Sequence, residues 1–256
     1  MQAAIEHELA TLGGSAACVV MRMDDAVPVK LVSINPDTVF PAASLAKVPI
    51  LVEVARQVEL GLLTWQTRYS VSDAARVASA GVIADLSAEL RPTLRDLAHL
   101  MITISDNTAS NMLLDIVGMD AVNATMRTLG LNSTRLERRF IDFGARRAGR
   151  DNWTLAGDMA LLFSLFCTDL LPGKETMLQM LLRQNDYTLL PAYWSEDIPF
   201  AHKTGGLEGI LHDAGILYPP AASSGPLIIA AMTANQSDKP LARFTLARIG
   251  RIIYKL

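Results

Sequence analysis

Three short groups of polar residues could carry chemistry in this sequence. The first is Ser44-Leu-Ala-Lys47, in which a hydroxyl and an amine stand three residues apart. On a helix this spacing corresponds to one turn, so the two side chains share a face. A serine hydroxyl becomes a nucleophile when a nearby base takes its proton, and a lysine whose pKa is lowered by burial can be that base. Ser44 is therefore a candidate nucleophile, with Lys47 as its proton acceptor.

The other two groups supply hydroxyls, an amide and a second cation. Ser105-Asp-Asn107 falls between two predicted helices, and Lys203-Thr-Gly205 falls on a predicted strand, where the glycine leaves the backbone open to a ligand. Each group alone also fits helix caps, turns and a surface lysine. In a chain of this composition all three together are expected by chance roughly 3 times in ten thousand, so we interpret the set as functional.

The elements that must position these groups form two classes along the chain. Periodicity predicts strands over 16–23, 29–34, 199–204, 212–218 and 226–233, near the two ends. It predicts helices over 2–12, 44–63, 93–104, 108–117, 120–130, 154–167, 174–184 and 241–254. Asp120 and Thr154 are expected to cap the helices that they begin, and Pro49 predicts a strained or 3₁₀-like first turn in the helix that carries Ser44.

This distribution predicts an α+β fold. The three late strands are joined by short loops, which favours antiparallel pairing. We expect residues 1–43 and 189–256 to form one antiparallel sheet flanked by the terminal helices, with an inserted all-helical domain over residues 44–188.

Composition narrows the functional classes. Of the 256 residues, 50% are hydrophobic and 19% are charged, with a net charge of −3, which suits a globular protein with a large core and provides no basic face for nucleic acid. No run of 18 apolar residues predicts a membrane span. Cys18 and Cys167 lie far apart and outside any Cys/His cluster, so we expect two buried thiols, no disulfide, no metal and no other cofactor. Oligomeric state is left open.

The first residues, Met1-Gln-Ala-Ala-Ile-Glu-His-Glu-Leu, contain no basic segment followed by an apolar one. This pattern predicts a cytoplasmic protein for the sequence as it stands, or a periplasmic or secreted one if a leader has been removed.

The three groups together resemble the signature of class A β-lactamases and penicillin-binding proteins. The resemblance extends over most of the chain, from Phe40-Pro41 through Ser105-Asp-Asn-Thr-Ala-Ser-Asn111 to the segment that ends at Pro220. It implies a β-lactamase/transpeptidase-like fold with a site between the two domains, an acyl-enzyme mechanism and a small-molecule substrate.

The resemblance also implies a role for each residue. Ser44 would attack the substrate after giving its proton to Lys47, and Ser105 would relay a proton to the leaving nitrogen.

The remaining residues would bind the substrate. Asn107 would bind its amide side chain, and Lys203 and Thr204 would hold its carboxylate beside Gly205. The backbone N–H of the nucleophile and that of Leu207 would form the oxyanion hole, where each donor contributes about 10²–10³ in rate.

One loop departs from the class A pattern. In those enzymes a glutamate and, four residues later, an asparagine hold the water that breaks the acyl-enzyme. Alignment on Arg135-Leu places Phe140 and Gly144 at these positions. Two carboxylates remain nearby. Glu137 is flanked by arginines and is expected to form a surface ion pair. Asp142 is a candidate catalytic carboxylate, with bracing of the loop as its alternative role.

These observations leave three functions open. The first is a serine hydrolase acting on β-lactams or related amides and esters, with turnover limited by deacylation. The second is a penicillin-binding-type D,D-peptidase or esterase, and the third is a protein that binds β-lactams without turnover. A Ser–His–Asp triad that uses His202 or His212 with Asp213 is less favoured, because Lys47 already provides a base.

Overall fold

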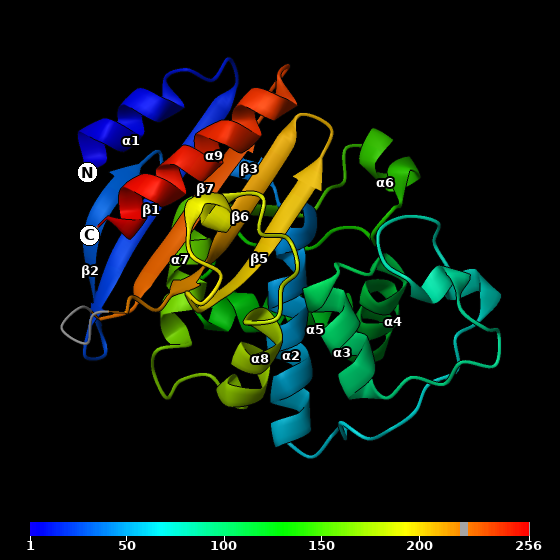
Figure 1. The fold of residues 1–256 in the computed structure, drawn as a ribbon. Coiled ribbons are helices and arrows are strands. Elements are labelled where there is room, and N and C mark those ends of the chain that lie inside the picture. Colours follow the sequence, from blue (N-terminus) through cyan, green and yellow to red (C-terminus); the bar gives the residue numbers. More distant parts are fainter. Residues whose placement is uncertain (221–224, 256) are drawn as a thin grey trace.

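The computed structural model describes residues 1–220 and 225–255, and its centre is a five-stranded sheet (Figure 1). The strand order is β2-β1-β7-β6-β5, and all four neighbouring pairs are antiparallel. The strands are β1 (Ser15–Asp24), β2 (Val27–Ile34), β5 (Phe200–Leu207), β6 (Ile210–Leu217) and β7 (Leu227–Ala234). The sheet thus joins the two ends of the chain, as predicted, and β5 forms one of its edges.

Helices cover both faces of the sheet. Every residue of β6 and β7 is buried, which shows that these central strands are covered on both faces, including the polar residues His212 and Asp213 of β6. Helices α1 (Gln2–Leu9) and α9 (Lys239–Tyr254) pack on one face, while α7 (Ala156–Leu165) packs against β1, β6 and β7. Figure 1 shows α1 and α9 lying side by side across the sheet.

The inserted region is organised around one helix, α2 (Lys47–Glu59), which follows the 3₁₀ turn η1 (Ala43–Ala46). Every residue from Lys47 to Ala55 is buried, because α2 contacts four other helices. These are α3 (Leu94–Thr103), α4 (Asn107–Val117), α5 (Met119–Thr128) and α8 (Lys174–Leu181). The 3₁₀ start confirms the expectation from Pro49.

The remaining elements are short. They are the paired strands β3 (Val39–Pro41) and β4 (Trp153–Leu155), α6 (Phe143–Arg147), and the 3₁₀ turns η2 (Asp73–Ala75), η3 (Ile83–Asp85) and η4 (Leu190–Tyr193). Two predicted caps were wrong. Helix α5 begins after Gly118, with Asp120 inside its first turn, and Thr154 lies in β4, so that α7 begins at Ala156.

The predicted boundary between sheet and helices does not separate two cores. One hydrophobic cluster contains residues of the sheet, such as Ile216 and Ile228, together with Leu97, Leu113 and Phe163 of the helices. A second cluster lies between the other face of the sheet and helices α1 and α9. The sheet and the inserted region therefore share a continuous core, although the division at residues 43/44 and 188/189 stays a prediction.

No helix in the described ranges is long and apolar enough to cross a membrane. Within the same ranges no group of three or more His, Cys, Asp or Glu could hold a metal ion. Both cysteines are free thiols; Cys18 is buried as predicted, whereas Cys167 is only partly buried.

The packing of α9 on η4 leads to a stability prediction. A Cβ atom at Gly250 would lie 1.9 Å from the carbonyl oxygen of Leu190. Alanine ordinarily stabilises a helix by about 1 kcal/mol relative to glycine, but here a backbone atom would have to move. We expect Gly250→Ala to lower the free energy of unfolding by about 1–3 kcal/mol in chemical denaturation. Gly13→Ala, where nothing lies within 4 Å of the added Cβ, is the matched control and should be nearly neutral.

Candidate active site

Ser44 lies in the 3₁₀ turn that begins the central helix. The preceding residue, Ala43, has a left-handed backbone (φ 47°), a conformation that non-glycine residues adopt at a cost of about 1–3 kcal/mol. The turn is held by the hydrogen bond from the Ala42 N–H to the Asn152 carbonyl, at 2.7 Å. Ser44 is partly exposed while its neighbours Ala43 and Leu45 are buried. The strained turn thus presents one hydroxyl at the rim of a packed core.

Lys47, one turn further along, is buried and surrounded by oxygen atoms. Its Nζ lies 2.6 Å from the carbonyl oxygen of Ser105, 2.9 Å from Ser105 Oγ and 2.8 Å from Asn107 Oδ1. Burial and the positive charge of Lys203 hold the pKa of Lys47 well below its usual value, with Asp106 opposing them. A lysine with a lowered pKa and a hydroxyl partner is suited to move protons.

Asp106, for which the sequence alone indicates no role, holds the second motif in place. Its buried carboxylate caps α4 through the Ala109 N–H and accepts the N–H groups of Val82 and Ile83 at 2.7 and 2.9 Å. Gly81 approaches so closely that a Cβ there would lie 2.3 Å from the Asp106 carboxyl group. These contacts fix the turn that carries Ser105 (φ 58°).

Asn107 makes a second polar contact that connects the same loop to the site. Its Nδ2 donates to Ser79 Oγ at 2.7 Å while its Oδ1 faces Lys47. Ser79 has no sequence motif, so only the fold identifies it. The predicted substrate-binding amide is therefore oriented from both ends.

The third motif lies on β5, whose open edge faces the turn at Ser44. Lys203 is buried, donates to the Thr204 carbonyl at 2.9 Å, and has its pKa lowered to about 8 by burial, against the opposing charges of Asp213 and Asp186. A Cβ at Gly205 would lie 3.2 Å from the Ser44 nitrogen, so glycine allows the strand to approach the nucleophile.

The register of β5 corrects one predicted donor. Leu207 and Ile210 flank a two-residue turn, and such a closing pair exchanges backbone hydrogen bonds. The Leu207 N–H is therefore directed toward β6. Because amides alternate along a strand, the N–H of Gly206 is directed toward the open edge that faces Ser44. Gly206, one residue earlier than predicted, is the candidate second oxyanion donor.

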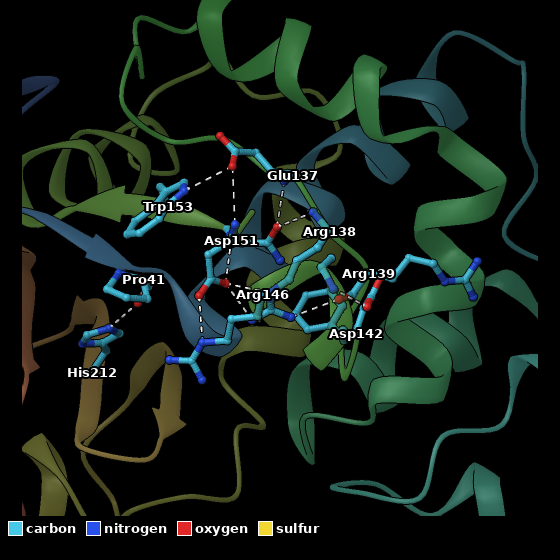
Figure 2. Close-up of polar contacts among 12 residues, drawn as sticks. Pro41, Glu137, Arg138, Arg139, Asp142, Arg146, Asp151, Trp153 and His212 are labelled. Carbon is cyan, nitrogen blue, oxygen red and sulfur yellow. Dashed lines mark hydrogen bonds and ion pairs between the residues drawn. The ribbon is translucent and has the colours of Figure 1, made fainter. Parts of the chain in front are cut away.

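The loop over residues 135–152 is tied together by a buried ion pair. Arg138 contacts Asp151 at 2.6 Å, with both side chains less than a tenth exposed, and Arg146 approaches the other carboxylate oxygen at 3.1 Å (Figure 2). Asn152 Oδ1 accepts the N–H groups of Glu137 and Arg138. These contacts fold the loop against Ser44.

Neither candidate carboxylate of this loop reaches the nucleophile. Glu137 forms the predicted ion pair with Arg135 at 2.7 Å. It also accepts a hydrogen bond from Trp153 Nε1 at 3.3 Å (Figure 2). Asp142 is exposed, and its Oδ1 accepts the Ala145 N–H at 2.8 Å as the cap of α6. This cap is the loop-bracing role given above as the alternative for Asp142, which is not among the described residues that line the cavity at Ser44; a catalytic role for Asp142 stays a prediction.

Phe140 occupies the place that the alignment assigned to the missing glutamate. Asn111 accepts the Phe140 N–H at 2.8 Å and donates to its carbonyl at 3.1 Å, and the ring centroid lies 4.9 Å from Lys47 Nζ. A cavity of about 230 Å³ opens here, lined by residues that include Ser44, Asn107, Phe140 and Gly206. Among its described lining residues there is no aspartate or glutamate.

The histidines do not form a triad with Ser44. His202 Nδ1 pairs with Asp213 at 2.8 Å on the face of the sheet that packs against α9, opposite to Lys203 and Gly205. His212 contacts the Pro41 carbonyl at 2.9 Å, and burial lowers its pKa to about 4, so it is neutral.

Comparison with known proteins agrees with this geometry. The sequence profile of the beta-lactamase enzyme family matches residues 2–256. The chain belongs to the beta-lactamase enzyme family. It is 29% identical over 192 residues to beta-lactamase AST-1 of Nocardia asteroides, an alignment that covers 70% of this chain but only 60% of that relative.

Solved structures of other proteins resemble the fold over nearly the whole chain. A beta-lactamase from Sphaerobacter thermophilus has a TM-score of 0.88 and 31% identity, covering 99% of this chain and 94% of that one. PBP-A has the same TM-score and coverage with 27% identity, and a mutant of PBP-A has been solved as its acyl-enzyme complex with penicillin G. These matches confirm the predicted fold class.

The buried ion pair of the loop leads to a second prediction. Arg138→Ala would leave Arg146 as the one cation paired with the buried Asp151 among the described residues, so we expect a loss of about 3–5 kcal/mol in the free energy of unfolding, measured by denaturant titration. Arg135→Ala removes an exposed pair from the same loop and should cost less than about 1 kcal/mol. Equal losses in the two variants would show that burial of the Arg138 pair does not hold the loop.

Proposed function

We propose that this protein is an active-site serine hydrolase that forms an acyl-enzyme at Ser44 with β-lactams or with related amides and esters. The observation that carries the proposal is the environment of Lys47, a buried amine one turn from Ser44 whose three oxygen neighbours include the hydroxyl of Ser105. The Ser105 carbonyl and Asn107 Oδ1 can only accept hydrogen bonds. Ser105 Oγ can also donate one, so it is the partner through which Lys47 exchanges a proton.

The reaction follows from these contacts. Lys47, whose pKa is lowered by burial and by the charge of Lys203, takes the proton of the Ser44 hydroxyl as Oγ bonds to the substrate carbonyl carbon. The N–H groups of Ser44 and Gly206 stabilise the oxyanion. When the carbon–nitrogen bond breaks, Ser105 passes its proton to the leaving nitrogen and receives one from Lys47. The proton lost by Ser44 is thereby transferred to the leaving group.

The charge of the site favours substrates that carry a carboxylate. Lys203 lies buried on β5 beside Thr204, on the strand that faces Ser44, and a buried cation attracts an anion strongly. β-Lactams combine such a carboxylate with a reactive amide. The relatives named beta-lactamases and the penicillin G complex of the PBP-A mutant support this substrate class.

Deacylation is the weak half of the proposed cycle. Class A enzymes use a loop glutamate to activate water, whereas here Phe140 stands in that position and no described lining residue of the cavity carries a carboxylate. Loss of a general base costs about 10²–10⁴ in rate. The same observation favours a second candidate function, a D,D-peptidase of the penicillin-binding type, which turnover of a D-Ala-D-Ala peptide would distinguish.

A cephalosporin time course tests the proposal directly. With a chromogenic cephalosporin and intact-mass detection, we expect a burst equal to the enzyme concentration, slow steady turnover and a lasting mass shift, because acylation outruns deacylation. Ser44→Ala should show neither burst nor adduct. A steady rate typical of class A enzymes would refute the deacylation argument, and an unmodified wild-type protein would refute the proposed function.

The pKa of Lys203 predicts a pH dependence. A lysine is cationic below its pKa, so the positive charge of Lys203 is lost as the pH rises through about 8. The second-order acylation rate of a carboxylate-bearing β-lactam should therefore fall above pH 8, since this rate reports the free enzyme. The methyl ester of the same β-lactam lacks the carboxylate and serves as the control. If the ester showed the same decline, Lys203 would not be the group that binds the carboxylate.

A further inference from the structure

The backbone of Phe140 is held more tightly than a loop residue requires. Asn111 on α4 binds both its N–H and its carbonyl, and the following residue, Ile141, has a left-handed backbone (φ 66°), which is rare for a β-branched side chain. The Phe140 side chain is only 7% exposed. Two hydrogen bonds and a strained neighbour therefore determine where the ring lies.

The ring lies over the amine of Lys47, with 4.9 Å between Nζ and the ring centroid. The three oxygen neighbours of Nζ come from Ser105 and Asn107, at the junction of α3 and α4, whereas the ring comes from the loop. An aromatic face attracts an ammonium group through its quadrupole, most strongly where water is excluded. Phe140 thus offers Lys47 an attraction without a titratable group.

We propose that Phe140 is a positioning residue for Lys47. The Phe140 ring holds the Lys47 amine against Ser105 and Asn107 and stabilises the ammonium form of that amine. The inference rests on the proposed function, because it concerns the lysine that takes the proton of Ser44. The Phe140 ring, which stands where class A enzymes have the loop glutamate, would thus keep Lys47 in place.

The effect of the Phe140 ring on Lys47 can be separated from the effects of the neighbouring charges. Lys203 on β5 disfavours the ammonium form of Lys47, and Asp106 at the start of α4 favours it. The Asp106 carboxylate is already bound by three N–H groups, and Arg138 in the loop is paired with Asp151. In the described ranges, no polar contact joins the charged groups of Lys203, Asp106 or Arg138 to the Phe140 side chain. A change of the ring therefore alters one attraction and leaves the charges in place.

The test compares Phe140→Leu with Phe140→Tyr. Leucine keeps an apolar, buried group but has no aromatic face, so the ammonium form of Lys47 loses its attraction. The acidic limb of the acylation rate should then move to lower pH by roughly half to one unit. Tyrosine keeps the face and should leave the limb in place. Phe244→Leu, on the exposed surface of α9, is the control for the type of substitution.

A titration independent of activity completes the experiment. The ¹³Cε resonance of Lys47, assigned with Lys47→Arg, should titrate at lower pH in Phe140→Leu than in the wild type. A reduced acylation rate without any shift in limb or resonance would overturn the inference and leave the ring with a packing role. If Phe140→Leu does not fold, Phe140→Met carries the same expectation. Failure of the wild type to acquire an acyl group would refute the proposed function alone, because the resonance still reports the contact.

Discussion

The burial of one amine is the constraint on which the site depends. A lysine at the buried start of α2 must be surrounded by acceptors, since a buried unpartnered amine is costly. The Ser105 turn supplies two of them, and Asp106 anchors that turn by binding three backbone N–H groups. The packing of α2, α3 and α4 therefore determines the chemistry of the site. The same hydrogen bonds offset the cost of burying the Lys47 amine and place that amine where it can act as a base.

The sheet contributes the other half of the site through its edge. Strand β5 has a neighbour on one side only, and its open edge approaches the turn at Ser44. Since one hydrophobic cluster runs from the sheet into the helices, the spacing of the two halves is set by a shared core rather than by a hinge. The loop closes the third side, where the buried pair of Arg138 and Asp151 adds to the packing of Leu136 and Phe140 in the shared core.

Much of this arrangement could be predicted from the residues alone. The apolar periods located the strands and long helices, and Pro49 indicated the 3₁₀ turn at Ser44. The two motif residues nearest Lys47, Ser105 and Asn107, do meet it. What the sequence could not provide came from tertiary geometry. The amide direction that favours Gly206 over Leu207 depends on the register, the cap formed by Asp142 depends on the loop, and Ser79 and the ring of Phe140 reach the site only through folding.

The close approach of Gly205 to Ser44 separates two properties of the site. One is the distance between the nucleophile and β5, and the other is the shape of the cavity beside them. The distance between the nucleophile and β5 is set by main-chain atoms, because no side chain at residue 205 stands between them. The side chains that line the cavity include several from the loop and from the Ser79 segment. The main chain therefore sets the distance between Ser44 and β5, whereas a rim side chain such as Phe143 can change the shape of the cavity without altering that distance.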